Sequence, residues 1–210
     1  MKHLRTSRLA VYAALGLSLS LISFFLLDER VYHLTRVTDK DAREIWLIIT
    51  DLGSSGWMAI VLISLWTVSS ILARITPENP RWKLLARQSV FVFIAVALTG
   101  IFTMVAKGIV GRARPYLFDT EGPSGFDPFV FQSSYASWPS GHTTTAFAFV
   151  VAIVLLAPRL KYILLPVAIL AGYSRMAVDA HYLADVIMGT TIGTIGAILV
   201  YQWLATKLKI

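Results

Sequence analysis

The sequence contains no cysteine. This absence excludes disulfides, thiolate chemistry and cysteine-ligated metal sites, but it selects no cellular compartment. Charged residues are also scarce, because they make up 15% of the 210 residues, whereas soluble domains have about 25%. No stretch combines a basic stripe with interleaved aromatic residues, so nucleic acid is not expected as a partner.

Apolar residues are abundant. They make up 56% of the chain, and the mean hydropathy is +0.67. Six apolar runs approach the length of roughly 20 residues that crosses a bilayer as a helix. We therefore predict an all-α integral membrane protein, a six-helix bundle that forms one domain over residues 1–210. The predicted membrane helices lie at about 9–27, 55–73, 88–106, 143–157, 161–178 and 186–205.

Two segments between these runs are expected to be non-helical. Residues 28–44 are charged, and residues 116–138 form the longest loop, with aromatic residues suited to the headgroup level. The first run follows Lys2, Arg5 and Arg8, as the apolar part of a signal peptide would. Because the run is longer than the usual stretch of roughly 7–15 residues and no small-residue cleavage site follows it, we expect it to remain as the first helix.

The distribution of Lys and Arg predicts the orientation in the membrane. Cytoplasmic segments carry an excess of these residues. With both termini inside, the inside segments hold more than half of them and a single acid, Glu78. We therefore predict a multi-pass protein of the bacterial cytoplasmic membrane with cytoplasmic termini. The inside residues would be Lys2, Arg5, Arg8, Arg74, Arg81, Lys83, Arg87, Arg159, Lys161, Lys207 and Lys209.

The unusual polar residues cluster at the ends of the apolar runs. Because neighbouring helices alternate in direction, all the clusters fall on one membrane face, which the charge distribution makes the outer, periplasmic face. Charged residues at the rim of a membrane bundle are usually functional, so we expect an active site at this face. The clusters are Lys107 with Arg114-Pro115, Ser140-Gly141-His142, Ser174-Arg175, and His181 with Asp185.

The basic members have the chemistry of a phosphate pocket. Arg binds phosphate in a bidentate manner and Lys binds it as a point charge, which makes Lys107, Arg114 and Arg175 candidate phosphate ligands. Free backbone N–H groups at a helix start add an anion site. Gly141 would let the backbone approach the ligand closely, and the Ser140 hydroxyl can donate a further hydrogen bond.

The two histidines have different surroundings. His181 and Asp185 are four residues apart, on one face of a helix, and a carboxylate can fix the tautomer of an imidazole. His181 is therefore the candidate nucleophile toward phosphorus, and His142 is the candidate acid for the leaving group. Taken singly, the cluster residues could be helix-start residues, a surface ion pair or snorkelling anchors. Their joint spacing favours a site.

Three motifs in this order resemble those of the type 2 phosphatidic acid phosphatase superfamily of membrane lipid phosphatases. Lys followed by six residues and Arg-Pro matches Lys107 to Pro115. Pro-Ser-Gly-His matches Pro139 to His142, and Ser-Arg followed by a spaced His and Asp matches Ser174 to Asp185. The stretch Leu52 to Ser55 loosely resembles a segment near the active-site end of small bacterial members.

The resemblance implies hydrolysis of a lipid phosphate monoester or pyrophosphate through a phosphohistidine, with no metal and no cofactor. His181 would attack, Asp185 would orient it and His142 would act as the acid. The expected partners are a membrane lipid phosphate and the bilayer, with no obligate protein partner. The phosphoryl oxygens would be held by Lys107, Arg114, Ser140, Gly141 and Arg175.

Two other functions share these features. Vanadium haloperoxidases carry the same three motifs, but they are soluble, and six apolar runs argue against a soluble enzyme. A transporter or lipid scaffold could bind anions in the pocket without turnover, although two histidines with Asp185 favour turnover. The sequence does not distinguish phosphatidylglycerophosphate, phosphatidate, undecaprenyl pyrophosphate and a lipid A phosphate as substrates.

Overall fold

The computed structural model describes residues 6–123 and 125–210. This part of the chain is helical and contains no strand, only an isolated bridge between Arg112 and Phe126. The long helices are α1 (Thr6–Leu26), α4 (Ser55–Ile75), α5 (Pro80–Val110), α7 (Gly141–Leu156), α8 (Lys161–Ala177) and α9 (Leu183–Leu208). The short ones are α2 (Asp28–Thr35), α3 (Lys40–Thr50), α6 (Phe118–Glu121), and the 3-10 turns Asp51–Gly53, Pro115–Leu117, Ser133–Tyr135 and Pro158–Leu160.

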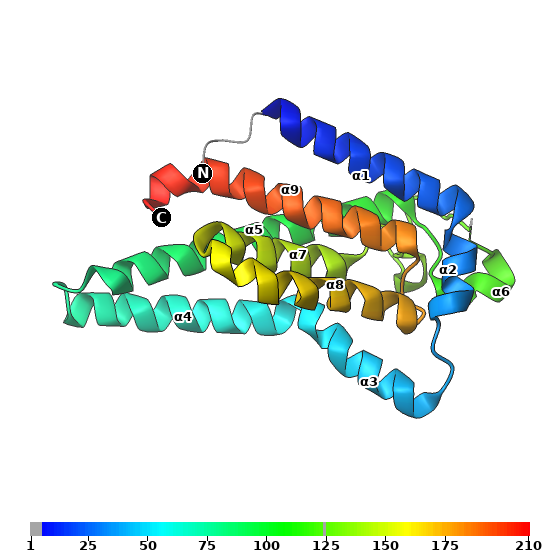
Figure 1. Cartoon of the computed structure of the whole chain (residues 1–210), viewed down its shortest axis with the longest axis horizontal. Helices are drawn as coiled ribbons and strands as arrows, with labels where there is room; N and C mark the ends of the chain where they lie inside the picture. Colours follow the sequence, from blue (N-terminus) through cyan, green and yellow to red (C-terminus); the bar gives the residue numbers. More distant parts are fainter. Residues whose placement is uncertain (1–5, 124) are drawn as a thin grey trace.

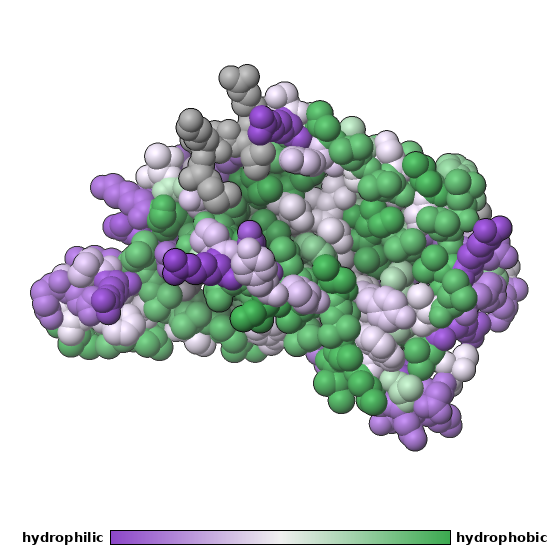
Figure 2. Space-filling view, in the orientation of Figure 1, coloured by the Kyte–Doolittle hydropathy of each residue, from purple (hydrophilic) through white to green (hydrophobic). Residues whose placement is uncertain are grey.

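The all-α prediction is confirmed, but the helix number differs from the predicted six. The described residues form nine α-helices, and the six long ones coincide with the six apolar runs. The chain segments that contain α1, α4, α5, α8 and α9 are each long and apolar enough to cross a membrane, whereas α7 is shorter. Apolar residues cover the middle of the surface, and hydrophilic residues gather at its ends (Figure 2). The chain is therefore a multi-pass membrane protein.

Helix α7 lies inside the bundle, where it packs against α5, α8 and α9 (Figure 1). Its contact with α9 is close because a Cβ atom at Gly193 would lie only 2.4 Å from the backbone oxygen of Thr144. The surrounding helices shield α7 from lipid, so it does not need the length of a lipid-exposed span. This central position brings the polar start of α7 into the interior of the fold.

The prediction that residues 28–44 are non-helical is wrong. Asp28 begins α2, and Asp39 caps α3 by accepting a hydrogen bond from the backbone N–H of Ala42 at 2.9 Å. α3 projects obliquely from the bundle (Figure 1) and contacts α8, where the rings of Trp46 and Tyr173 lie 5.2 Å apart. Capping and this contact stabilise a helix that the charged sequence does not suggest. The loop of residues 116–138 is also interrupted, by the single turn of α6.

The two ends of the bundle differ. The turn between α4 and α5 and the end of α9 lie at one end, and α2 and α6 lie at the other (Figure 1). The end of α5 and the start of α9 lie on the side of α2 and α6, as the alternating directions require. Lys2 and Arg5, which contribute to the predicted orientation, fall outside the described residues.

Candidate active site

The end of α5 carries the first predicted cluster. Lys107 lies in the last turn of α5, and the helix stops because Gly111 adopts a left-handed conformation with φ of 60°. A Cβ atom at Gly111 would also lie 1.8 Å from the backbone oxygen of Asp127, so the loop packs directly on this glycine. The left-handed cap turns the chain out of the helix and leads it to Arg114 at the bundle end.

The start of α7 carries the second cluster, and the predicted helix start is confirmed. Ser140 is the N-cap, and its side-chain oxygen accepts hydrogen bonds from the hydroxyl of Thr143 at 2.8 Å and from the backbone N–H of Thr143 at 3.5 Å. The Ser140 backbone N–H donates to the backbone oxygen of Asp185 at 3.0 Å, which ties α7 to α9. Because Ser140 is fully buried, its contact with phosphate stays a prediction. Gly141 lies beside Lys107, whose Cε would be 3.5 Å from a Cβ added at this glycine.

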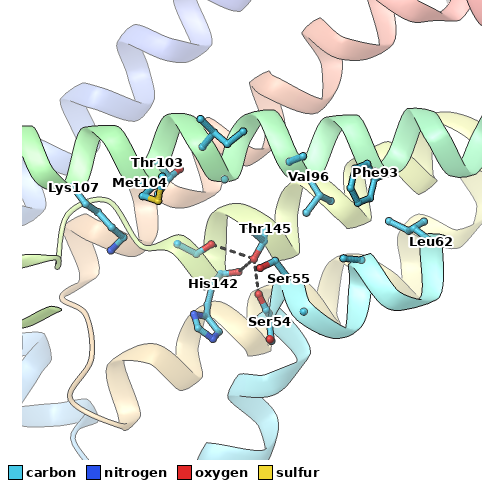
Figure 3. Close-up of a pocket in the computed structure, with 17 residues that line it drawn as sticks. Ser54, Ser55, Leu62, Phe93, Val96, Thr103, Met104, Lys107, His142 and Thr145 are labelled. Carbon is cyan, nitrogen blue, oxygen red and sulfur yellow. Dashed lines mark hydrogen bonds between the residues drawn. The ribbon is translucent and has the colours of Figure 1, made fainter. Parts of the chain in front are cut away.

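His142 lines a cavity of about 630 Å³ between α4, α5 and α7. His142 and Lys107 lie at one end of it, and the apolar side chains of Phe93 and Leu62 lie at the other (Figure 3). Met104 on its rim is 63% exposed. The cavity is thus a groove that leads from polar residues at the bundle end along the apolar face of the helices.

The segment Leu52 to Ser55, the loosest of the sequence matches, borders this groove. Gly53 and Ser54 line it, and the backbone oxygen of Gly53 accepts a hydrogen bond of 2.5 Å from the hydroxyl of Thr145. A Cβ atom at Gly53 would lie 2.8 Å from the backbone oxygen of His142. Glycine is required here because two backbone segments meet without room for a side chain.

The three predicted cations lie within electrostatic range of His142. Lys107, Arg114 and Arg175 each interact electrostatically with its ring. Lys107 donates to the backbone oxygens of Ala136 and Ser137, whereas Nη1 of Arg175 donates to the hydroxyl of Thr50 at 2.7 Å. Burial lowers the pKa of Arg114. Among the described residues, the buried Nε atoms of Arg114 and Arg175 have no hydrogen-bond partner, so donors remain available for an anion.

His181 and Asp185 come together, but not on one face of a helix as predicted. Tyr182 is the N-cap of α9, and its backbone N–H donates to Oδ2 of Asp185 at 2.8 Å. This cap starts the helix after His181, which therefore lies in the preceding turn. Nδ1 of His181 is 3.5 Å from Oδ2 of Asp185, which is longer than an ordinary hydrogen bond, and among the described residues this buried nitrogen has no hydrogen-bond partner. Catalytic hydrogen bonds are often this long before substrate binds.

The surroundings of His181 favour a neutral imidazole. His181 is 3% exposed, and burial lowers its pKa well below the ordinary value. Lys107 and Arg175 lower this pKa further, while Asp185 acts in the opposite direction. Both histidines thus interact with the same two cations, Lys107 and Arg175. The polar clusters of four chain segments therefore converge.

Sequence reasoning missed three residues that contact the predicted ones, Ser137, Thr50 and Arg112, and a fourth, Asp28, that pairs with Arg112. Ser137 donates to Oδ2 of Asp185 at 2.5 Å, and Thr50 accepts from Arg175. Arg112 joins Asp185 to Asp28 through two ion pairs of 2.7 Å. A signal for Arg112 existed, because it is a further cation inside the Lys107 to Pro115 motif and lies on the face that the charge rule depletes.

The described residues contain no group of three or more His, Asp and Glu side chains placed to hold a metal ion. The site is instead cationic, with two histidines at the end of a membrane-spanning bundle. This combination defines a class of helical membrane protein with a cluster of cations and histidines at one end.

Comparison with known proteins identifies the family. Residues 88–209 match the PAP2 superfamily, and the chain belongs to this superfamily. Lipid A 1-phosphatases of Rhizobium etli and Rhizobium johnstonii are 32% and 33% identical over 72% and 70% of this chain. These matches cover 66% and 61% of the two relatives, just under two thirds of their length.

A solved structure supports the fold. The chain is similar to a crystal structure of a transmembrane PAP2-type phosphatidylglycerolphosphate phosphatase from Bacillus subtilis, with a TM-score of 0.67 and 20% identity. The similarity covers 95% of this chain and 96% of the other. The helical arrangement described above is therefore that of a known transmembrane fold.

Proposed function

We propose that this protein hydrolyses a lipid phosphate monoester or pyrophosphate, without a metal, through a phosphohistidine at His181. The observation that carries this proposal is the convergence of two histidines on the same cations, Lys107 and Arg175, beside a groove with apolar walls. Cations hold the phosphate, and the groove accepts the lipid tail. An anion-binding transporter or scaffold has no need for a buried neutral histidine beside a carboxylate.

The reaction follows from the contacts of each histidine. Nδ1 of His181 faces Asp185, so Nε2 attacks phosphorus. The P–N bond forms as the P–O bond to the lipid breaks, and His142 gives its proton to the departing oxygen. Lys107, Arg114 and Arg175 hold the phosphoryl oxygens, with Ser140 and Gly141 at the helix start. Water that loses a proton to His142 then attacks phosphorus, the P–N bond breaks, and phosphate leaves.

The groove supports a membrane lipid as the substrate. It runs between α4 and α5 and opens beside the exposed Met104, so a lipid can keep its tail in the apolar part while its phosphate reaches His142. The candidates are phosphatidylglycerophosphate, undecaprenyl pyrophosphate, phosphatidate and a lipid A phosphate. The names of the two Rhizobium relatives favour testing the lipid A phosphate first.

The proposed location is the bacterial cytoplasmic membrane, with both termini in the cytoplasm and the site facing the periplasm. The Lys and Arg distribution supports this orientation. Each candidate lipid carries its phosphate at the headgroup level, where the ends of α5 and α8 and the starts of α7 and α9 would lie. The protein then acts on its substrate within the membrane and needs no protein partner.

The test is phosphate release by the purified full-length protein from each of the four lipids in detergent micelles. We expect release from at least one lipid in the presence of excess EDTA. His181→Ala should lower the rate roughly a thousandfold or more, whereas replacement of the exposed His33 by alanine should change it less than about twofold. Release from none of the lipids, or equal release by a folded His181→Ala variant, would contradict the proposal.

A further inference from the structure

Arg112 is a buried cation that the proposed reaction does not use. It is 1% exposed, and it lies between two buried carboxylates. Nη1 lies 2.7 Å from Oδ1 of Asp185, and Nη2 lies 2.7 Å from Oδ2 of Asp28. The guanidinium also lies over the rings of Tyr182 and Phe24, at 4.2 and 4.8 Å from their centroids. Both terminal nitrogens are therefore occupied, which separates Arg112 from the phosphate ligands.

The contacts of Asp185 show what Arg112 controls. Oδ1 accepts from Arg112, while Oδ2 accepts from Ser137 and from the backbone N–H of Tyr182 and faces His181. A carboxylate that is held on both oxygens cannot rotate. Loss of the bond to Oδ1 would leave the carboxylate held only at Oδ2, by Ser137 and Tyr182, so its plane would be free to turn relative to His181.

The contacts of Asp28 extend the network to the N-terminal helices. Oδ1 of Asp28 accepts from the hydroxyl of Ser23 at 2.8 Å and from the backbone N–H of Ala184 at 2.9 Å. Asp28 therefore binds the start of α9 directly and also through Arg112. The first turn of α2, which lies outside all three sequence motifs, reaches the residue that orients His181.

We propose that Arg112 is a positioning residue that holds Asp185, and through it His181, in the geometry for attack, with Asp28 as its anchor on α2. The part that concerns attack rests on the proposed function. At metal sites, removal of a residue that orients a ligand commonly lowers activity about 10–100-fold. We expect an effect of the same size for a residue that orients Asp185. Buried ion networks can also act only as structural clamps, so the test must separate the two roles.

The charge of Arg112 allows a positioning role to be distinguished from a purely structural one. The charged groups that interact with His181 are Asp185 and the cations Lys107 and Arg175 of α5 and α8. When Arg112 is neutralised, the charge of Asp185 is no longer offset, and the protonated form of His181 is stabilised. The pKa of His181 then rises toward its ordinary value. A purely structural clamp would lower activity equally at every pH.

The experiment compares Arg112→Gln, Arg112→Lys and Asp28→Asn with Arg30→Gln, a control at an exposed arginine close to α2's start. For Arg112→Gln we expect kcat to fall about 10–100-fold with a KM change below about threefold, and the acid limb of the pH profile to move up by roughly one pH unit. Arg112→Lys should restore part of the rate, since lysine keeps the charge but binds as a point charge.

Asp28→Asn should lower kcat in the same direction, and adding it to Arg112→Gln should cost little more, because both changes break one network. If Arg112→Gln does not fold, Arg112→Met, which also removes the charge, carries the pH comparison, and Arg112→Lys and Asp28→Asn still carry the comparison of kcat with KM. The chain has four histidines, so NMR titration of isotope-labelled histidine follows His181 without turnover, with His181→Ala as the assignment control.

The two proposals can fail separately. If the wild-type protein releases no phosphate from any lipid but the His181 titration moves upward in Arg112→Gln, the proposed function is wrong and the charge coupling of Arg112 to His181 stands. A folded variant in which Arg112 has lost its charge, with an unmoved His181 titration and an unmoved acid limb, would overturn the positioning role, even with an active wild-type enzyme.

Discussion

At the scale of single residues, the environment of His181 decides the chemistry. A protonated imidazole has no lone pair for attack on phosphorus, and burial, followed by nearby cations, lowers the pKa of His181 and so favours its neutral form. Asp185 raises the pKa of His181 but does not outweigh burial and the cations. Its two oxygens already accept hydrogen bonds from Arg112 and Ser137. The site therefore combines a firmly held carboxylate beside His181 with a low affinity of the ring for a proton.

This environment predicts the acid side of the pH profile. Burial lowers the pKa of His181 well below its ordinary value, which is about 6.5. A lowered pKa means that the ring binds a proton only at lower pH. As the pH falls, kcat/KM should therefore stay level past about 6.5 and should decline only at a pH well below that value. The measurement uses a short-chain phosphate monoester, corrected for its own ionisation. An acid limb with its midpoint above about 6.5 would be inconsistent with a buried neutral His181.

At the scale of elements, the groove between α4 and α5 links the membrane to the site. Its residues come from both helices and from the start of α7, and its polar end holds Lys107 and His142 (Figure 3). A lipid tail in the groove would contribute apolar binding energy, which the enzyme can use to bring the phosphate to His181.

The groove can be blocked from α5. Ala97 lines it, whereas the neighbouring Leu98 is 45% exposed and lies outside it. Ala97→Trp should raise KM for a full-length lipid roughly tenfold or more and leave a water-soluble short-chain phosphate nearly unchanged. Leu98→Trp is the matched control and should affect neither substrate. Equal losses for both substrates in Ala97→Trp would show that the groove does not bind the tail.

The sequence predicts some of the helices and misses others. Long apolar runs predict the six long helices, since their length and composition leave few alternatives. α2 and α3 escape prediction because their stability depends on a cap at Asp39 and on contacts with other helices. Residue spacing predicts that His181 and Asp185 lie close together, but Tyr182 starts α9 after His181. The pairing of Arg112 with Asp28 joins residues far apart in the chain, which no local pattern reveals.

At the scale of the whole molecule, the orientation in the membrane determines which lipid pool the enzyme reaches. The predicted site lies at the end with α2 and α6, opposite the turn between α4 and α5 (Figure 1). The basic residues Arg81, Lys83 and Arg87 lie near that turn, as the positive-inside rule requires for a cytoplasmic end. The same rule predicts a periplasmic site.

Single cysteines can test the orientation, because the chain has none of its own. Thr120 on α6 and Glu78 in the α4–α5 turn are both exposed. Thr120→Cys should react with a membrane-impermeant thiol reagent in intact cells, after permeabilisation of any outer membrane, and Glu78→Cys should react only after lysis. The reverse labelling pattern would invert the orientation.

The account depends most on a covalent phosphoryl group at His181. The direct measurement is brief reaction with a lipid carrying ³²P in its phosphate, alkaline quenching, and mapping of the acid-labile label to a peptide. His142→Ala should retain label on the His181 peptide longer than the wild type, because it lacks the base that activates water. His181→Ala should carry no label. Label that persists in His181→Ala, or phosphate release by the wild type with no labelled histidine at any time, would contradict the mechanism.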